Sequence, residues 1–412
     1  ATQIRASRAR WSPGRWRADS RTPTLRDINR DYHTIVIGAG VIGAATALEL
    51  ARRGLRTLCV DKLPASGYGS TGNSCAIVRT HYSTPEGTAL AWESYLRWKA
   101  WGDYLGAGDE RGLAHLNETG LVVVRTDEHP YDRHLAHHDA LGIPYEVWSL
   151  DELAKRVPFF DVASYGPPRL PDDERFGEQS ESDLLGAVYF PHAGYVNDPQ
   201  LAAHNLQRAA EAQGAEFRFN CEVTAVTRDS GRVLGVELGP GNSVRAPVVV
   251  NAAGPHSFVL NRLAGVEDDM SVTTRALRRE VHYLPFPTGA RPEGYGRIAT
   301  DDDVGIYCRA ETGGMMLVGS LDPECDPPEW VTDPDSFERD VTPERWRAQV
   351  YRAALRIPGL SIPSRPKGVA DLYDVTEDWI PIYDRSSLDG FYLAVGTSGN
   401  QFKNAPLVGE LM

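Results

Sequence analysis

One segment near the start of this 412-residue chain, residues 34–62, constrains the fold more than any other. An apolar run over Thr34–Ile37 predicts a strand, and Gly38-Ala-Gly-Val-Ile-Gly43 follows it directly and opens a helix lined with small residues. A second predicted strand then leads to Asp61. This order is typical of a βαβ unit that binds a dinucleotide, because the glycines let a pyrophosphate approach backbone N–H groups and the acid accepts ribose hydroxyls.

Charge and cysteine content exclude several classes of protein. A net charge of −13 argues against nucleic acid as the main partner. The chain contains no run of 18 apolar residues, so we expect no membrane span. Five scattered cysteines without a Cys-x-x-Cys pair fit a reducing cytoplasm and argue against a disulfide framework or a zinc site.

Residues 1–30 differ from the rest, because they hold eight Arg and two Asp. We interpret them as an arm that lies on the acidic body or on a partner subunit, so an oligomer or a complex is expected. An organelle transit peptide is the alternative.

Two later segments repeat the combination of apolar strand, small residues and helix start. Val244–Asn251 runs into Ala252-Ala-Gly-Pro255, and Phe391–Val395 runs into a glycine loop over residues 396–403. Each predicts a further close approach of the backbone to a bound dinucleotide. Between them, residues 271–322 predict several antiparallel strands.

Other segments have simpler interpretations. Aromatic residues at a spacing of three in residues 86–104 predict one long helix with a buried stripe. His134, His137 and His138 lie on another expected helix, and we interpret them as an exposed face, because no Cys or carboxylate at ligand spacing completes a metal site. The polar, proline-rich residues 161–183 predict a surface insertion or lid.

Taken together, the βαβ unit, Val250-Asn-Ala-Ala-Gly-Pro255 and Gly396–Lys403 resemble the FAD-dependent amine and amino-acid oxidoreductases, which are D-amino acid oxidase-like. Within them, sarcosine oxidase, glycine oxidase and dimethylglycine dehydrogenase are the most similar. The resemblance extends from about Tyr32 to Met412. An NAD(H) enzyme on a simple Rossmann domain is the alternative, but it does not explain three dispersed cofactor-like loops.

The resemblance implies an α/β fold, α+β overall, in which a Rossmann-like FAD-binding domain is interleaved with an antiparallel-sheet substrate domain. The expected ranges are 1–30 for the arm, 31–120, 184–265 and 366–412 for the FAD-binding domain, and 121–183 and 266–365 for the substrate domain.

The cofactor implied is FAD. The residues expected to bind it are Gly38, Gly40, Val41, Gly43, Asp61, Lys62, Ser70, Thr71, Ser74, Val223, Ala253, Gly254, Gly396, Gly399, Asn400, Gln401, Phe402 and Lys403. Relatives attach the flavin covalently through a Cys or a His, and the corresponding positions fall near Asp371 and Asn73. Neither attachment residue is present there, so non-covalent FAD is expected. Cys75 is the nearby thiol that would overturn this expectation.

The resemblance also implies catalytic residues. Arg79, in Ala76-Ile-Val-Arg-Thr-His-Tyr82, and Lys403 match two cations that bind the substrate carboxylate, and the alternative for each is a surface ion pair. Tyr307 and Tyr373 match pocket aromatics, and His81 and Tyr307 are candidates for adjusting the proton on the amine.

The implied reaction is oxidation of the C–N bond of an N-alkylated or simple amino acid, similar to sarcosine, dimethylglycine or glycine. It proceeds by hydride transfer to flavin N5 and hydrolysis of the imine. The alternatives are oxidation of a 2-hydroxy acid and a flavin-binding subunit or assembly factor without turnover of small amines. Sarcosine oxidases carry a lysine that promotes reaction with oxygen. Met316 or Leu317 replaces it here, so oxygen and a protein electron acceptor both remain open.

Overall fold

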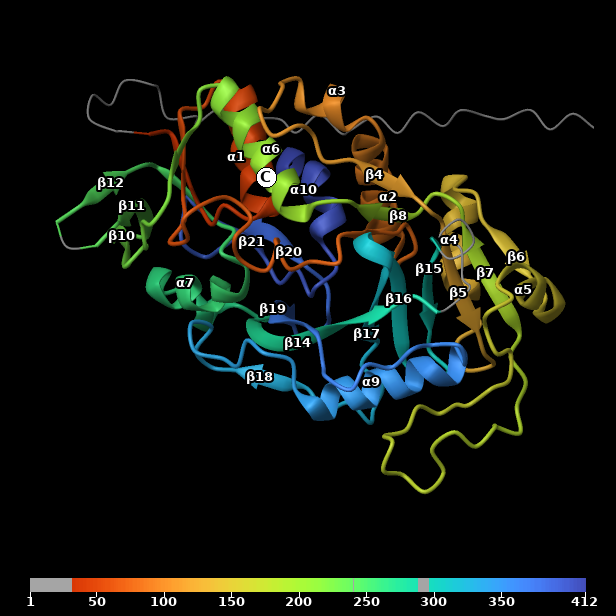
Figure 1. The fold of residues 1–412 in the computed structure, drawn as a ribbon. Helices are drawn as coiled ribbons and strands as arrows, with labels where there is room; N and C mark the ends of the chain where they lie inside the picture. The colour runs from red at the N-terminus through yellow and green to blue at the C-terminus, as the bar shows by residue number, and fades with distance from the viewer. Residues whose placement is uncertain (1–31, 240, 288–295) are drawn as a thin grey trace, which may run out of the picture.

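The structure, a computed structural model, describes residues 32–239, 241–287 and 296–412 (Figure 1). The arm expected over residues 1–30 therefore lies outside the described part of the chain. Within that part, the strands form two large sheets that lie side by side and two small sheets at their borders.

The first large sheet is six-stranded, in the order β20-β21-β13-β1-β2-β9, and all its neighbours are parallel except β20 and β21. Its strands are β1 (Thr34–Ile37), β2 (Thr57–Val60), β9 (Glu216–Arg218), β13 (Val248–Asn251), β20 (Ile382–Arg385) and β21 (Phe391–Val395). Two interior strands, β1 and β2, are buried along their whole length, as a parallel sheet covered on both faces requires.

Helices cover one face of this sheet and a small sheet covers the other. The helical side consists of α1 (Val41–Arg52), α6 (Pro199–Ala212) and α10 (Ala405–Leu411), which pack together over Val36, Cys59 and Val250 (Figure 1). The other side consists of α7 (Ser257–Ala264) and the sheet β10-β11-β12 (Ala225–Asp229, Arg232–Glu237, Ser243–Arg245). This layered α/β arrangement confirms the fold class predicted from the glycine loops.

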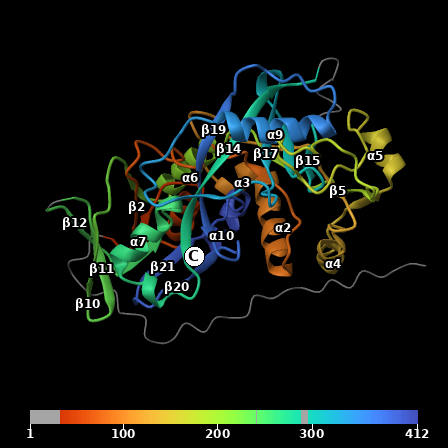
Figure 2. The same ribbon diagram turned by 90° about the horizontal axis from the view of Figure 1, so that it is seen from below.

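The second large sheet is nine-stranded, in the order β18-β14-β17-β16-β15-β5-β7-β6, with β19 also paired to β14. Its strands are β5 (Leu121–Arg125), β6 (Glu146–Trp148), β7 (Gly186–Phe190), β14 (Thr274–Pro285), β15 (Ile298–Asp301), β16 (Ile306–Glu311), β17 (Met315–Ser320), β18 (Glu329–Val331) and β19 (Gly368–Thr376). Helix α9 (Pro343–Arg356) packs along one face, as the view from below also shows (Figure 2).

Sheet pairing corrects the predicted domain ranges at two places. The FAD-binding ranges 184–265 and 366–412 begin with β7 and β19, and both strands belong to the nine-stranded sheet. The reason is that β19 pairs with β14 over nine residues before the chain crosses to β20 in the other sheet.

Two expected elements are divided. The helix predicted over residues 86–104 is α2 (Pro85–Lys99) followed by α3 (Trp101–Leu105), because Ala100 leaves the helical conformation. The strand predicted over Val244–Asn251 is β12 and β13, separated at Pro247, which lacks an N–H for a ladder hydrogen bond.

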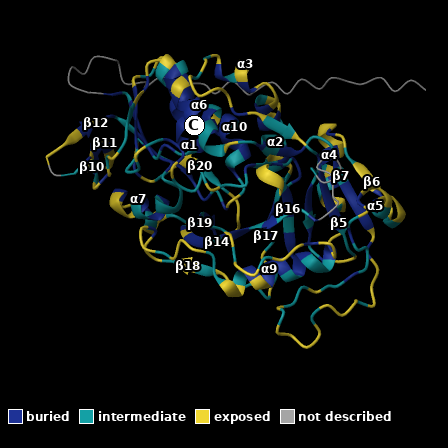
Figure 3. Cartoon of the chain, in the orientation of Figure 1, coloured by how far each residue is buried: buried dark blue, intermediate teal, exposed yellow. Residues whose placement is uncertain are grey.

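The remaining elements lie at the border of the sheets. They are β3 (Ile77–Val78), β4 (Leu116–Glu118), β8 (Gly194–Val196), α4 (Asp132–Leu141) and α5 (Leu150–Arg156). Residues 161–183 form neither helix nor strand and are largely exposed in a loop that extends from the body (Figure 3). No helix among the described residues is long and apolar enough to cross a membrane.

Candidate active site

The turn between β1 and α1 shows why its glycines are needed. A Cβ on Gly38, where φ is +103°, would lie 2.3 Å from the carbonyl oxygen of Ala252, and a Cβ on Gly43 would lie 1.8 Å from the carbonyl oxygen of Gly38. Backbone packing therefore excludes a side chain at both positions. Gly40 differs, because the nearest atom to its Cβ position is the Thr71 hydroxyl oxygen at 3.1 Å. That hydroxyl also accepts the N–H of Val41, 3.1 Å away.

Asp61 lies at the end of β2, as predicted for the acid that binds a ribose. Its two carboxylate oxygens accept the N–H groups of Ala39 at 2.6 Å and Leu63 at 2.8 Å. Burial raises the pKa of Asp61, and these two hydrogen bonds oppose the rise. The neighbouring Lys62 instead pairs with Asp335 and contacts His256.

The other glycine loops converge on Asp374, which the sequence analysis missed. Its carboxylate on β19 accepts the N–H of Gly396 at 2.6 Å and the hydroxyl of Ser257 at 3.0 Å, and its carbonyl oxygen accepts the N–H of Ser398. Asp374 thus connects the loop after β21 with the loop that contains Gly254. Its second carboxylate oxygen is buried without a hydrogen-bond partner among the described residues.

Asp374 also predicts a dependence of stability on pH. Burial raises its pKa to about 7, above the ordinary 3.8. Between about pH 4 and 7 the folded chain holds a proton that the unfolded chain has released, so this group lowers the free energy of unfolding as pH rises. Asp374→Asn removes the carboxyl group that titrates. We expect the free energy of unfolding of this variant, minus that of the unsubstituted chain, to rise by on the order of 2–3 kcal/mol from pH 5 to pH 8.

Urea unfolding at the two pH values measures this difference. Asp268→Asn, at an exposed acid, is the control. Parallel pH profiles for Asp374→Asn and the unsubstituted chain would contradict the prediction.

Arg79 and Lys403 meet at the ring of Tyr82. The Arg79 guanidinium carbon lies 4.4 Å from the ring centroid and the Lys403 ammonium nitrogen 5.2 Å. Arg79, just beyond β3, donates to the carbonyl oxygen of His81, and Lys403, in the short helix η4 (Phe402–Asn404), donates to that of Asn400. No carboxylate of the described residues lies within ion-pair distance of either cation.

The burial of Lys403 makes this absence significant. Its side chain is almost fully enclosed. Burial lowers the pKa of Lys403 well below its ordinary value, and the charge of Arg79 lowers it further. A buried cation without an acid is unfavourable unless an anion arrives. An anionic group beside the pair would offset this cost.

Aromatic residues of α2 and neighbouring elements hold the loop that carries Lys403. Trp98 donates its indole N–H to the carbonyl oxygen of Lys403 at 2.6 Å and stacks on Phe402. Tyr82 donates its hydroxyl to the carbonyl oxygen of Asn400, and Tyr383 donates to the side chain of Gln401. The predicted aromatic stripe of α2 is thus buried at Trp98 and also supports the site.

The three histidines of α4 do not form an exposed face, so that prediction was wrong. His138 is fully buried and its ring contacts the hydroxyl of Thr80 at 3.1 Å, while His134 is half-buried beside His81. The helix packs this face against the segment that carries Arg79, which a helical spacing alone does not reveal. Burial lowers the pKa of His134 to about 4 and that of His81 well below its usual value.

Tyr307 and Tyr373 form a second group on one face of the nine-stranded sheet. The hydroxyl of Tyr307 lies 3.4 Å from the Cys75 sulfur, and Tyr373 packs against Gly399, whose added Cβ would lie 2.0 Å from the ring. Burial raises the pKa of Tyr307 well above its ordinary value, so its hydroxyl stays protonated.

Asn73 and Asp371 stand near the positions where relatives attach the flavin covalently, and they contact each other. The Asn73 side-chain amide donates to the Asp371 carboxylate at 2.6 Å. Burial raises the pKa of the nearby Cys75, which therefore stays a thiol.

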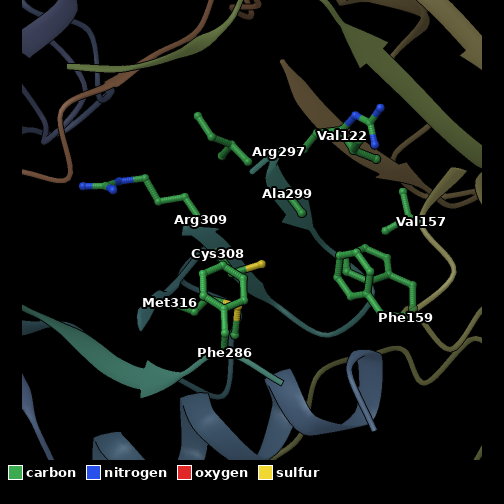
Figure 4. A pocket seen from close by; sticks show the side chains of 11 residues that line it. Val122, Val157, Phe159, Phe286, Arg297, Ala299, Cys308, Arg309 and Met316 are labelled. Atoms are coloured by element: carbon green, nitrogen blue, oxygen red, sulfur yellow. The ribbon is translucent and has the colours of Figure 1, made fainter. Parts of the chain in front are cut away.

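Strand β17 shows which of Met316 and Leu317 lies on the face that carries Tyr307. Successive side chains of a strand point to opposite faces. Leu317 pairs with Arg309 and Gly319 with Tyr307, so Leu317 shares that face. Met316 points the other way, into a cavity of about 20 Å³ that admits about one water molecule (Figure 4).

Five other predicted cofactor residues lie around these loops. Ser70 donates its hydroxyl to the carbonyl oxygen of Leu372, and the Ser74 hydroxyl accepts the N–H of Ala76. Ala253 donates its N–H to the side chain of Asn251, and Phe402 stacks on Trp98. Val223 is buried in a loop beside Asp61.

A larger cavity of about 530 Å³ reaches Arg79, whereas Lys403 does not line it. Arg79, His81 and Tyr82 line it from one side and Asn400 and Gln401 from the other. Further lining residues, absent from the sequence analysis, are Leu90, Tyr131, Thr300, Leu321, Trp379, Ile380 and Tyr383.

The described residues fit a bound dinucleotide. Only the Thr71 hydroxyl approaches the Cβ position of Gly40, and the N-terminus of α1 directs the Val41 N–H at the same hydroxyl. Asp374 has a buried oxygen without a partner among the described residues. A pyrophosphate and polar cofactor groups suit these features.

Comparison with known proteins agrees with this geometry. Residues 33–412 match the family described as FAD dependent oxidoreductase, DAO. The chain is 24% identical to sarcosine oxidase subunit beta of Rhizobium meliloti (strain 1021), covering 97% of this chain and 86% of that one. It is 25% identical to glycine oxidase of Geobacillus kaustophilus (strain HTA426), with 92% of each covered. Among solved structures, L-proline dehydrogenase from P. horikoshii shares the fold with a TM-score of 0.75, at 21% identity over 93% of this chain and 92% of that chain.

Proposed function

The chain belongs to the DAO family of FAD-dependent oxidoreductases, and we propose that it oxidises the C–N bond of an amino acid with a free carboxylate, either N-alkylated or simple. The observation that carries the proposal is the pair of cations, Arg79 and Lys403, around the ring of Tyr82 without an acidic partner among the described residues.

The two cations differ in what they offer a carboxylate. Arg79 presents a planar fork that matches two carboxylate oxygens, whereas Lys403 presents a point charge. A bound carboxylate stabilises the protonated Lys403 and so opposes the effect of its burial. Together they would fix one end of the substrate and orient the bond that is oxidised.

FAD, when bound, supplies the two-electron acceptor. The residues that would hold it are Val41 and Thr71 at the pyrophosphate, Asp61 at the ribose and the loop Gly396–Gln401 at the ring system. The N–H groups of Gly396, Ser398 and Asn400 already donate within the protein, so the remaining N–H groups of that loop would stabilise negative charge that develops on the ring.

His81 is the side chain placed to adjust the proton on the amine. It lines the cavity beside Arg79, and its Nδ1 has no hydrogen-bond partner among the described residues. Its lowered pKa keeps the ring neutral, so Nδ1 can accept a hydrogen bond from the substrate's ammonium group.

The proposal extends to partners and to the electron acceptor. The relative from Rhizobium meliloti is named as a subunit, so we include a partner subunit or an oligomer of this chain. Oxygen and a protein acceptor both remain candidates, because Leu317 places no cation on the Tyr307 face at that position. We also propose a cytoplasmic location, from the scattered cysteines.

Anaerobic mixing of the FAD-loaded protein with a panel of acids tests the proposal. We expect sarcosine, dimethylglycine, glycine, proline or a larger N-alkyl amino acid to bleach the flavin absorbance, and matched amines without a carboxylate to fail. Bleaching by 2-hydroxy acids alone would contradict C–N oxidation. A loaded protein that none of these compounds reduces, and that copurifies with a stable partner, would indicate a binding subunit instead.

A further inference from the structure

The large cavity extends well beyond what a small amino acid fills. We propose that the substrate carries a bulky apolar substituent, of the size of an aromatic ring, on its amine or α-carbon, and that Tyr131 and Trp379 hold this group; the inference rests on the proposed function. It names the substrate class of the site without changing the reaction.

The volume and lining of the cavity give the first argument. At about 530 Å³ it falls in the range of pockets that enclose drug-sized ligands, whereas glycine or sarcosine would fill a small part of it. Arg79 lines one end of it and the carboxylates Glu86 and Asp378 line other parts. Apolar side chains line much of the remainder: Leu90, Tyr131, Leu321, Trp379, Ile380 and Pro381.

The cavity adjoins the space expected for the cofactor at Asn400 and Gln401 and extends away from it. Its lining includes no residue of the β1–α1 turn, and neither Tyr307 nor Tyr373 contributes to it. The volume therefore extends from Arg79 toward the N-terminus of α2, the N-terminus of α4 and the turn between β19 and β20, and the substituent would occupy this part.

The backbone at Tyr131 and Trp379 gives the second argument. Both residues adopt the left-handed conformation, with φ of +63° and +60°. For a bulky residue this conformation is unfavourable, and glycine would form either turn with less strain. Such strain clusters at ligand-binding sites, and both residues line the same cavity from different elements.

Other residues hold the Tyr131 side chain and the backbone turn at Trp379 in place. Tyr131 donates its hydroxyl to Asp302 at 2.7 Å, and its ring packs against His134 at 4.9 Å. The Trp379 turn is closed by hydrogen bonds from Trp379 N–H to the Thr376 carbonyl oxygen and from the Thr376 hydroxyl to the Ile380 carbonyl oxygen.

The exposure of the outer wall points to the same occupant. Trp379 is 41% exposed and Ile380 is 48% exposed although both line a cavity. Adjacent apolar side chains left open to water indicate a binding surface. An apolar substituent attached to a carboxylate held at Arg79 would cover them.

Matched substrate pairs test the proposal in the FAD-loaded protein. We expect N-benzylglycine or phenylalanine, as either enantiomer, to reduce the flavin anaerobically with a kcat/KM at least about tenfold above that of sarcosine or glycine, respectively. Phenylacetate should likewise shift the flavin absorbance with a Kd about tenfold below that of acetate.

Substitution of Trp379 locates the effect. Trp379→Ala should lower kcat/KM for the bulky substrate about tenfold, through KM, and leave that for the small one within about twofold. Trp379→Gly should lower kcat/KM for the bulky substrate in the same way. Because glycine also relieves the left-handed strain, this variant controls for a folding defect in Trp379→Ala. Trp330→Ala is the matched control, because Trp330 is 40% exposed on β18 and does not line the cavity.

The outcomes separate the two proposals. Small amino acids that reduce the flavin at least as well as bulky ones, or equal effects of Trp379→Ala on both, would overturn this inference and leave the proposed function intact. If no amino acid of either size reduces the flavin, the proposed function fails. The comparison of phenylacetate with acetate then decides whether the cavity accepts an aromatic acid.

Discussion

Arg79→Ala is expected to lower kcat/KM for every amino acid that the protein oxidises by about 100-fold or more, while FAD stays bound. Truncating one partner of a buried charge pair costs about 2–5 kcal/mol, and each 1.4 kcal/mol is a factor of ten. Arg79 lies at the cationic end of the large cavity and beside Lys403, which cannot replace its two-pronged geometry. Steady-state kinetics give the ratio, and flavin absorbance after gel filtration reports cofactor retention.

Two further variants show whether the carboxylate is the cause. Arg79→Lys keeps the charge without the fork, so its kcat/KM should fall between those of the alanine variant and the unsubstituted protein. Arg347→Ala should change nothing, because Arg347 is an exposed residue of α9 that pairs with Asp172. Intact turnover in Arg79→Ala would show that this cation does not bind the substrate.

The strands and loops that the sequence predicted share a strong local signal. The limits of β1, β2 and β21 agree with the prediction, since each is a short apolar run that ends at a glycine turn or an acid. Helix α6 begins with a local signal of the same kind, since Pro199 is its first residue and the Asp198 side chain accepts the N–H of Leu201 at 2.8 Å.

The position of the two cations was predictable for a different reason. Neither local propensity nor spacing places Arg79 near Lys403, 324 residues later in the chain. The family resemblance of their flanking motifs implied it, and Tyr82 joins them in the structure.

Features that depend on contacts between distant segments were not predictable. Asp374 is an unremarkable acid in the sequence, and only the pairing of β19 with β14 places it beneath the loop of Gly396. The burial of His138 follows from packing of α4 against Thr80. A left-handed Trp379 has no sequence signal, because turns of this kind usually carry glycine or asparagine.

Gly40→Ala is expected to weaken FAD binding by about 100-fold and leave the fold intact. The backbone of Gly40 has φ of −67°, which alanine adopts without strain, and the added Cβ would approach the Thr71 hydroxyl at 3.1 Å. The apoprotein can accommodate that contact with a small shift. A pyrophosphate at the N-terminus of α1 cannot, because it must approach the backbone where the methyl group would lie.

Titration of the apoprotein with FAD, followed by quenching of flavin fluorescence, gives the Kd, and thermal unfolding of the apoprotein reports the fold. Gly108→Ala is the control, since Gly108 is exposed, has no atom within 4 Å of its Cβ position and should change neither quantity. Gly43→Ala should differ from both, because its Cβ would collide with the Gly38 carbonyl oxygen and lower stability itself. Unchanged FAD affinity in Gly40→Ala would show that the pyrophosphate does not bind at this turn. The proposed placement of the whole cofactor would then be wrong.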